Sequence, residues 1–352
     1  KSISPLTQRC KRPEPHLMEN ILITGGAGYI GSHIALELLK AKFNVSVIDN
    51  LSNSSTNSLN AVEKLTGKKI SFVEGDIRNQ DFLDQFFKIH PIDCVIHCAG
   101  LKAVAESIQK PYEYYENNII GSLNLIKAMK NYSVKKLIFS SSATVYDEGE
   151  KMPLFETSAI GQGQNPYART KIMIEKILQD HVISDSGWSI IVLSYFNPVG
   201  NDPSCLIGED PKGIPNNLMP LINQAAFNTR KLTVFGADYD TPDGSAIRDY
   251  IHVSDLAKDH ALCVRQSLDL DHKLKIYNLG LGKGVSVLEI INTYEKVNDV
   301  KLNYKLGDRR KGDLPICFAD NSNARKELSW DPKLSLEDMC KHSYQWYQQK
   351  IS

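Results

Sequence analysis

The feature that most constrains the fold is a glycine-rich turn between an apolar segment and an amphipathic one. Residues 20–24 form a short apolar run that stops at Gly25, and Gly28 and Gly31 follow at regular spacing. Apolar residues then recur at helical spacing through residues 34–39. Glycines in such a turn let the backbone approach a diphosphate, and the N-terminus of the following helix attracts its negative charge. The segment predicts the strand, turn and helix of a dinucleotide site.

The end of the next apolar segment strengthens this prediction. Residues 44–48 lead into Asp49, about 20 residues after the glycines, where dinucleotide-binding folds place a ribose-binding acid. Asn50 follows, and no arginine is adjacent. Because a carboxylate here accepts the ribose hydroxyls of NAD and repels the additional phosphate of NADP, we predict NAD as the cofactor.

Strand-like apolar segments alternate with amphipathic ones through the first half of the chain. This alternation is typical of a parallel sheet that is covered by helices on both faces. We therefore predict an α/β fold, with a Rossmann-type doubly wound parallel sheet and a smaller mixed α/β C-terminal substrate-binding domain. Residues 275–280 predict one more parallel strand. The other strand-like segments after Asp49 are 70–73, 94–97 and 136–139.

A phenol and an ammonium lie four residues apart directly after a proline. Tyr167 follows Pro166, and Lys171 is on the same face of the predicted helix because residues four apart stack on one side. Such pairs also occur by chance on exposed helices. Upstream, the strand at 136–139 breaks into three serines that end at Ser142, where a hydroxyl can reach a substrate at the carboxyl edge of the sheet. Ser142, Tyr167 and Lys171 together predict a catalytic set.

Composition excludes several classes of partner. Lysine and arginine number 41 and aspartate and glutamate number 41, so nothing indicates a nucleic-acid or polybasic membrane surface. No segment has the roughly 18 apolar residues that a membrane-spanning helix needs. The seven scattered cysteines predict reduced thiols and a cytoplasmic location. Cys94 and Cys98 lie in an apolar run with His97, which favours core positions, and we predict no metal site.

Together these residues resemble the extended short-chain dehydrogenase/reductase family, and within it the epimerases of nucleotide sugars, from Met18 onward. The resemblance rests on motifs in both halves of the chain. They are Thr24–His33, Asp49–Leu51, Glu74–Arg78, Ala99–Val104, Ser140–Tyr146, Tyr195–Gly200, Gly213–Pro220, Arg248–Val253 and Arg309–Pro315.

The resemblance implies a set of binding residues for NAD and for a UDP-sugar. Ser142, Tyr167, Lys171 and Phe196 are expected to contact the cofactor, and the first two and Phe196 also the sugar. The other expected cofactor residues are Gly25, Gly28, Tyr29, Ile30, Gly31, Asp49, Asn50, Asn53, Ser54, Asp76, Ile77, Cys98, Ala99, Gly100, Lys102 and Asn117. The other expected substrate residues are Lys102, Asn197, Asn216, Asn217, Leu218, Phe235, Arg248, Tyr250, Arg310, Asp313 and Cys317. Two arginines can fork onto a diphosphate, which agrees with this assignment.

The same resemblance divides the chain into three parts. Residues 1–17 are expected to be an appendage, disordered or vector-derived, whose removal leaves activity intact. Residues 18–196 are expected to form the NAD-binding Rossmann domain with the catalytic residues. Residues 197–352 are expected to bind the UDP-sugar, with some segments that return to the Rossmann sheet.

The implied reaction is the interconversion of UDP-galactose and UDP-glucose in galactose metabolism, through transient oxidation at C4 of the sugar. Tyr167 would be the base, and its phenol needs about 4 kcal/mol of phenolate stabilisation, which Lys171 and the cofactor's positive charge can supply. Cys317 lies where such enzymes set the room beside the C2 substituent. Because cysteine is small, we expect UDP-N-acetylgalactosamine and UDP-N-acetylglucosamine to be interconverted too.

Asp147 stands where glycine is usual, a departure that concerns only the local turn. The segments 117–130 and 167–180 resemble helices of a homodimer interface. A 4,6-dehydratase would have an acid pair after the catalytic hydroxyl, whereas Ala143 and Thr144 follow here. A uronate epimerase, or a non-catalytic NAD-sensing protein of the same fold, is a further alternative, although the latter need not keep the Tyr-Lys pair.

Overall fold

The computed structural model describes residues 19–213, 215–269, 273–310 and 312–352. The expected appendage at residues 1–17 lies outside this part of the chain. None of the described helices has the length and apolar character needed to cross a membrane.

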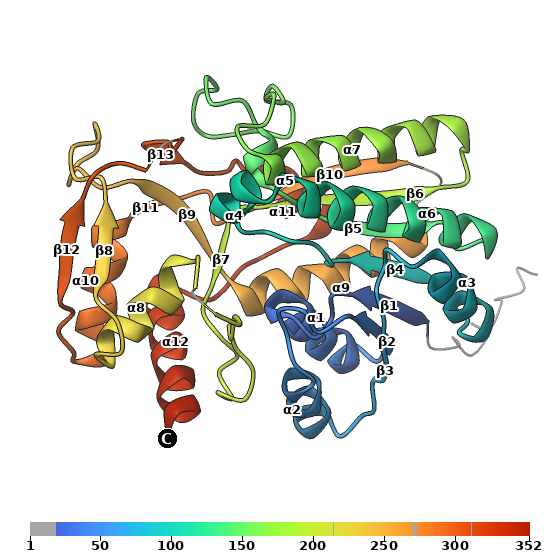
Figure 1. The fold of residues 1–352 in the computed structure, drawn as a ribbon, viewed down its shortest axis with the longest axis horizontal. Helices are drawn as coiled ribbons and strands as arrows, with labels where there is room; N and C mark the ends of the chain where they lie inside the picture. Colours follow the sequence, from blue (N-terminus) through green and yellow to red (C-terminus); the bar gives the residue numbers. More distant parts are fainter. Residues whose placement is uncertain (1–18, 214, 270–272, 311) are drawn as a thin grey trace, which may run out of the picture.

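A seven-stranded parallel sheet forms the centre of the larger part of the molecule (Figure 1). Neighbouring strands in it are all parallel, which confirms the predicted fold class. The strand order changes direction between β1 and β4, and open α/β sheets bind ligands at the carboxyl ends beside such a point. In order across the sheet, the strands are β10 (Leu274–Leu279), β6 (Ser189–Tyr195), β5 (Lys136–Ser142), β4 (Cys94–His97), β1 (Asn20–Thr24), β2 (Asn44–Asp49) and β3 (Ser71–Glu74).

Both faces of this sheet are buried, and the central strands show why their sequences are continuously apolar. In β1, Ile21 and Ile23 pack into one hydrophobic core and Leu22 packs into the other. Successive side chains of a strand point to opposite faces, so a strand between two layers of helices needs an apolar residue at every position.

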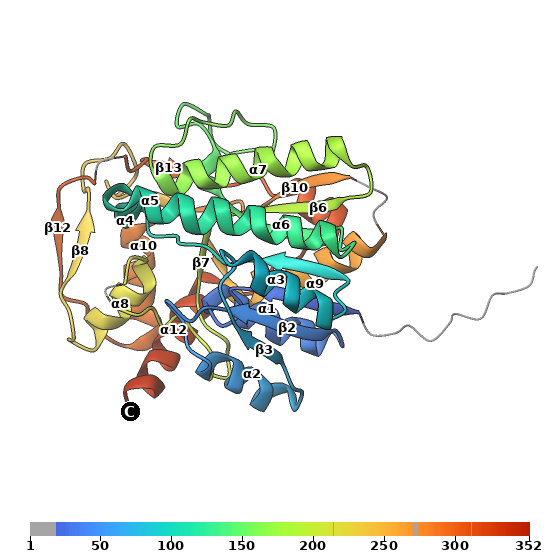
Figure 2. The ribbon, with the colours of Figure 1, turned by 45° about the vertical axis from the view of Figure 1, so that its right-hand side comes forward.

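Helices cover the two faces in two groups, and α6 and α7 lie side by side on one of them (Figures 1 and 2). The group packed around the core that contains Ile21 is α1 (Tyr29–Lys40), α2 (Asn57–Thr66), α9 (Val253–Asp269) and α11 (Ser322–Leu328). The group around Leu22 is α3 (Gln80–Ile89), α6 (Gly121–Asn131) and α7 (Pro166–Ser184). Short helices α4 (Val104–Gln109), α5 (Pro111–Tyr114) and η2 (Ala143–Val145) follow strand ends or precede α6.

The helix expected from residue 117 onward begins differently from the prediction. A π-helical turn, η1 (Tyr115–Ile120), precedes α6. Within it the buried Asn118 side chain donates to the Leu101 carbonyl at 3.0 Å and to Thr170 Oγ1 at 3.1 Å. π-helical turns are rare and occur frequently at functional sites. Here the turn ties the loop after β4 to α7.

The smaller part of the chain is built around β9. Strand β7, which starts directly after Phe196 at the end of β6, pairs with β9 and so carries the chain from the main sheet into this part. Its elements are β7 (Asn197–Val199), α8 (Leu218–Ala226), β8 (Leu232–Phe235), β9 (Ile247–His252), β11 (Gly284–Ser286), α10 (Val287–Asn298), β12 (Tyr304–Gly307), β13 (Ile316–Cys317) and α12 (Leu336–Ile351). The strand predicted at 275–280 returns to the main sheet as β10, parallel to β6.

Candidate active site

The glycine turn joins β1 to α1 and has the geometry that a bound diphosphate requires. Gly25 has a φ of +71°, and a Cβ there would lie 2.7 Å from the Ala99 backbone nitrogen. A Cβ at Gly31 would overlap the Gly25 carbonyl oxygen. Helix α1 starts at Tyr29 without a side-chain cap, so the backbone N–H groups of its first turn are directed outward. These donors and the close backbone fit an anionic dinucleotide such as NAD.

Asp49 ends β2 beside this turn, as the sequence predicts. Its Oδ1 accepts from the Leu51 backbone at 2.9 Å and from Ser54 Oγ at 2.8 Å, and its Oδ2 accepts from the Ala27 backbone at 3.0 Å. A carboxylate offers about four lone-pair directions, so one on Oδ2 is left for a ribose hydroxyl. Asp49 thus holds the turn in shape, and its contact with a ribose stays a prediction.

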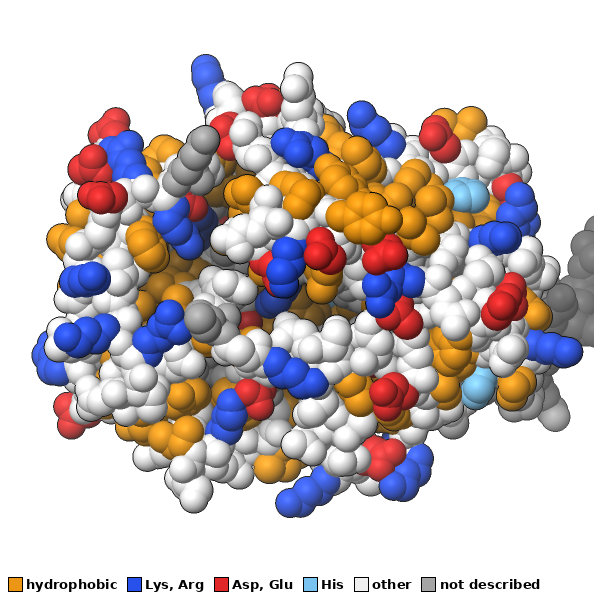
Figure 3. All heavy atoms as spheres, in the orientation of Figure 1, with side chains coloured by type: hydrophobic (Ala, Val, Ile, Leu, Met, Phe, Trp, Pro, Cys, Tyr) orange, Lys and Arg blue, Asp and Glu red, His pale blue; other side chains and the backbone are white. Residues whose placement is uncertain are grey.

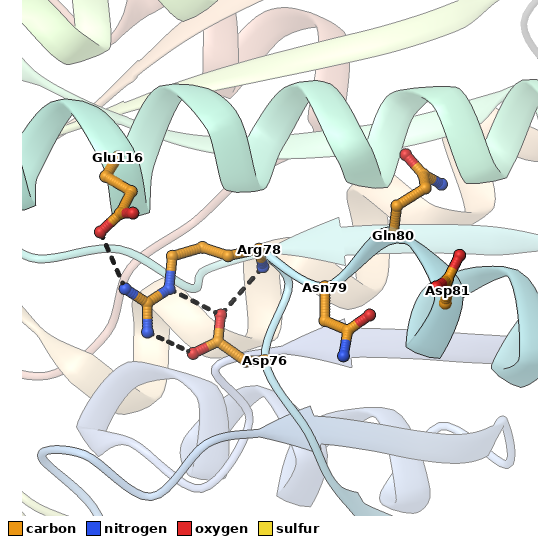
Figure 4. Close-up of a pocket in the computed structure, with 6 residues that line it drawn as sticks. All are labelled: Asp76, Arg78, Asn79, Gln80, Asp81 and Glu116. Atoms are coloured by element: carbon orange, nitrogen blue, oxygen red, sulfur yellow. Dashed lines mark hydrogen bonds and ion pairs between the residues drawn. The ribbon is translucent and has the colours of Figure 1, made fainter.

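Asp76 is more heavily engaged than the sequence suggests. It lines a shallow depression of about 530 Å³ (Figure 4), and it accepts from Asn50 Nδ2 at 3.1 Å and from the backbone N, Nε and Nη2 of Arg78. The hydrogen bonds from Arg78 lower the pKa of Asp76 to about 2. Arg78 also reaches Glu116 on η1 at 3.1 Å. These contacts fill the lone pairs of Asp76, so its direct contact with the cofactor stays a prediction.

The remaining expected cofactor residues lie around the carboxyl ends of β2, β3 and β4. Asn53 accepts from the Lys212 backbone at 3.0 Å. Ile77 is buried against Gly121 of α6. Asn117 donates to Asn118 at 3.0 Å. The others that follow β4 are Cys98, Ala99, Gly100 and Lys102.

Helix α7 carries the phenol and the ammonium. Asn165 caps it by accepting from the Ala168 backbone at 2.9 Å, and Pro166 occupies the first turn, where no backbone donor is needed. Tyr167 and Lys171 therefore share one face, with Lys171 Nζ 6.0 Å from the Tyr167 ring centroid. Lys171 Nζ also donates to the Ser140 carbonyl at 2.6 Å, which fixes α7 against the end of β5.

Burial shifts the protonation of this pair in opposite directions. It raises the pKa of Tyr167, and a hydrogen bond with Ser142 counteracts this. It lowers the pKa of Lys171 to about 8. At neutral pH Lys171 is therefore still protonated, and its charge favours the phenolate form of Tyr167.

The three serines at the end of β5 have different partners. Ser140 Oγ contacts Tyr195 Oη at 2.7 Å and Cys98 Sγ at 3.1 Å. Ser141 donates to the buried carboxylate of Glu175 on α7. Ser142 Oγ accepts from Thr144 Oγ1 at 3.1 Å and from the Thr144 backbone at 3.3 Å, so its own proton is directed to Tyr167 or to a ligand beside it. Ser142, the residue that the sequence favours, is the serine best placed to donate.

One cavity of about 300 Å³ joins this catalytic set to the smaller part of the chain. On the molecular surface a hollow opens between α8 and β8 on one side and α4 and α5 on the other (Figure 3). Most of the residues expected to bind substrate lie in its wall. The expected residues in the lining are Tyr29, Ile30, Lys102, Ser142, Tyr167, Phe196, Asn197, Asn216, Asn217, Leu218, Phe235, Arg248, Tyr250, Arg310 and Asp313.

The cavity wall also carries two guanidinium groups around one carboxylate. Arg310 Nε donates to Asp313 Oδ2 at 2.8 Å, and Arg248 Nη2 lies 3.6 Å from Asp313 Oδ1. Arg310 also stacks over the Phe235 ring, with 5.3 Å between the guanidinium carbon and the ring centroid. Each guanidinium keeps further N–H groups for a diphosphate, because arginine has five donors.

Cys317 is close to the cavity but not in its lining. It pairs with Arg248 across β13 and β9, and it packs in a small cluster with Phe196 and Tyr146. Burial raises the pKa of its thiol to about 11, so the side chain is an uncharged, compact group beside Phe196.

Two details of the sequence analysis are settled by the backbone and burial. Asp147, which stands where glycine is usual, is not among the residues with positive φ, so its turn needs no left-handed conformation. His97 is buried between Thr24 and Ser122, each 2.8 Å away, and burial lowers its pKa to about 3. His97 is a neutral core residue, as the sequence favours.

Three residues that support the site were not predicted from the sequence. Glu175 and Asn118 are both buried and reach catalytic segments, and Glu209 contacts Lys102 and Asn217 of the cavity wall. The spacing of Glu175, four residues after Lys171, was a signal that could have indicated a shared helix face.

Comparisons with known proteins agree with this site. The family model described as "NAD dependent epimerase/dehydratase family" matches residues 21–280. The UDP-glucose 4-epimerase of Bacillus subtilis is 48% identical over 94% of this chain and 98% of its own length. That of Pasteurella multocida is 51% identical over 93% and 96%. The crystal structure of UDP-glucose 4-epimerase from Bifidobacterium longum in complex with NAD+ and UDP is 46% identical, with a TM-score of 0.91, over 94% of this chain and 99% of that one. The chain therefore belongs to the NAD-dependent epimerase/dehydratase family.

Proposed function

We propose that this chain is an enzyme, a UDP-glucose 4-epimerase that interconverts UDP-galactose and UDP-glucose and keeps NAD bound. The observation that carries the proposal is that one cavity is lined by Ser142 and Tyr167 and also by Arg248 and Arg310. A sugar next to the phenol and a diphosphate next to the arginines describe a nucleotide sugar. The relatives and the structural neighbour named above support this substrate class.

The roles of the residues follow from their positions. Tyr167 accepts the proton of the sugar 4-hydroxyl, Ser142 donates a hydrogen bond to the same oxygen, and Lys171 holds a positive charge that favours the phenolate. NAD, held at the glycine turn and Asp49, would supply the acceptor and then the donor of the C4 hydride. Phe196, at the junction of the two parts of the chain, lies between the cofactor side and the sugar. When hydride returns to the other face, Tyr167 gives its proton back, so the chain ends each cycle as it began.

Turnover by a Tyr167→Phe variant tests this assignment. Phenylalanine keeps the ring and removes the proton acceptor, so turnover of UDP-galactose should fall by a factor of about 100 to 10,000. UDP should bind with an affinity close to that of the wild type, which calorimetry can measure. Near-normal turnover in this variant would remove Tyr167 from the role of base.

Competing functions make different predictions for the same site. A 4,6-dehydratase should have an acid pair after the catalytic hydroxyl, but here Thr144 donates to Ser142 instead. A protein that only senses NAD needs neither Tyr167 in the cavity wall nor Lys171 beside it. Conversion of UDP-galactose to UDP-glucose by the wild type would exclude a protein that only senses NAD.

We further propose that N-acetylated UDP-hexoses are substrates. Cys317 packs against the cluster that contains Phe196. Its small thiol should leave room near the sugar's C2 substituent where a tyrosine would not. Incubation with UDP-N-acetylgalactosamine should give UDP-N-acetylglucosamine. A wild-type enzyme that converts only the unsubstituted sugars would refute the size argument.

A homodimer is also part of this proposal. Apolar side chains gather on the surface of α4 to α7 (Figure 3), and six of them are exposed. A surface of this kind is typical of a protein–protein interface. Light scattering should give twice the chain mass, and Leu123→Asp should give a monomer. The six exposed apolar side chains of this surface are Val104, Ile108, Tyr112, Ile120, Leu123 and Met173.

The free cysteines of the described residues agree with a cytoplasmic location.

A further inference from the structure

One carboxylate contacts two residues of the cavity wall that come from different parts of the chain. Glu209 lies in the segment between β7 and α8 and is only 9% exposed. Its Oε1 lies 3.4 Å from Lys102 Nζ and accepts from Asn217 Nδ2 at 2.5 Å. Both partners are in the cavity wall. A single oxygen atom therefore holds one donor from each half of the site.

The two donors come from different parts of the chain, and of the two only Lys102 is expected to contact the cofactor. Lys102 follows β4 on the cofactor side, close to the point where the strand order changes direction. Asn217 precedes α8 on the side of the proposed nucleotide-sugar site. A lysine side chain loses rotamer entropy when it is fixed. A ligand that orders one donor therefore reduces the ordering that remains when the other ligand binds.

The segment that carries Glu209 is fixed at several points, so its carboxylate cannot simply follow either donor. The Glu209 backbone donates to Asn201 Oδ1 at 2.8 Å. Tyr29 of the glycine turn donates to the Gly200 carbonyl at 2.5 Å. Lys212 Nζ donates to the Leu51 carbonyl at 2.6 Å, beside Asp49.

We propose that Glu209 is a positioning residue that couples the NAD half of the site to the UDP-sugar half. It orients the Lys102 ammonium and the Asn217 amide together. A ligand that orders one of these donors therefore reduces the entropy lost when the second ligand binds. The proposal rests on the function proposed above. Such coupling is reciprocal, so bound UDP raises the affinity for NAD by the same factor by which bound NAD raises the affinity for UDP.

The test is the rate at which NAD leaves the holoenzyme, measured with and without saturating UDP, which allows no turnover. In the wild type UDP should slow the loss of NAD by about tenfold, within the range usual for coupled sites. Glu209→Gln keeps the shape but removes the charge that holds Lys102, so UDP should then change the rate by less than about twofold. Glu148 is exposed and is far from both donors in the sequence. Glu148→Gln should therefore keep the wild-type ratio of the two rates.

Two results would overturn the proposal. One is a wild-type ratio in Glu209→Gln, and the other is no effect of UDP in the wild type. If thermal melting shows that Glu209→Gln does not fold, Lys102→Met and Asn217→Ala break the same connection from either side. Each should then abolish the effect of UDP, and a wild-type ratio in both would refute the coupling. A separate assay of UDP-galactose turnover tests the proposed function, so the two failures are distinguishable.

Discussion

Turnover should fall above about pH 8, because Lys171 then loses the charge that favours the Tyr167 phenolate. Burial of Lys171, which is 7% exposed, lowers its pKa from 10.5 to about 8. Above that pH the protonated fraction falls about tenfold for each unit, and turnover should follow it.

The same shift has the opposite effect on stability. The pKa of Lys171 is lower in the folded chain than in the unfolded one, so between about pH 8 and 10.5 the unfolded chain binds more protons. Its contribution therefore destabilises the fold by about 3 kcal/mol below pH 8, and this cost disappears as the pH rises to 10.5. Keeping this charged ammonium buried beside the phenol therefore lowers the stability of the fold.

The assay is kcat for UDP-galactose in holoenzyme between pH 6.5 and 10, compared with Lys171→Met. Methionine has a similar length and no charge, so the variant should be slow and should lack the decline near pH 8. A decline of the same steepness at the same pH in Lys171→Met would show that another group causes it, and would refute this account of Lys171.

Three further predictions follow from single positions. Cys317→Tyr should suppress the conversion of N-acetylated UDP-sugars and spare UDP-galactose, which product analysis by NMR measures; equal loss of both would contradict the size argument. Asp49→Asn should reduce the preference for NAD over NADP by about tenfold or more in titrations of apoprotein, since the repelling charge is removed. Gly25→Ala should lower the free energy of unfolding by more than about 1 kcal/mol in urea, and by more than Gly67→Ala, where the φ is also positive but a Cβ meets nothing within 4 Å.

The main sheet was predictable because each of its strands carries a local signal. Ile21, Leu22 and Ile23 are apolar at consecutive positions only because helices cover both faces, and the glycine turn marks where α1 begins. The π turn at Tyr115–Ile120 was not predictable. Its cause is the pairing of Asn118 with Leu101 and Thr170, and those contacts join segments that are far apart in the chain.

Some residues of the candidate site were predictable from the sequence, and others were not. Tyr167 and Lys171 were predictable because helical spacing alone puts them on one face, and the capping Asn165 and Pro166 show where that helix starts. Glu209 was not, since its role depends on the path of the segment after β7, which the sequence does not reveal. The binding assignments for Asp76 and Cys317 remain predictions, because one carboxylate is filled by Arg78 and the thiol lies outside the cavity lining.

The most direct test of the central claim is to incubate the purified chain with UDP-galactose, without added NAD if the cofactor is retained and with it otherwise, and to follow the sugars by NMR. The account predicts that UDP-glucose appears until the two epimers reach equilibrium, with no net consumption of NAD. It also predicts that the same mixture forms from UDP-glucose. Absence of UDP-glucose in a folded, NAD-loaded preparation, or appearance of a dehydrated sugar, would contradict it.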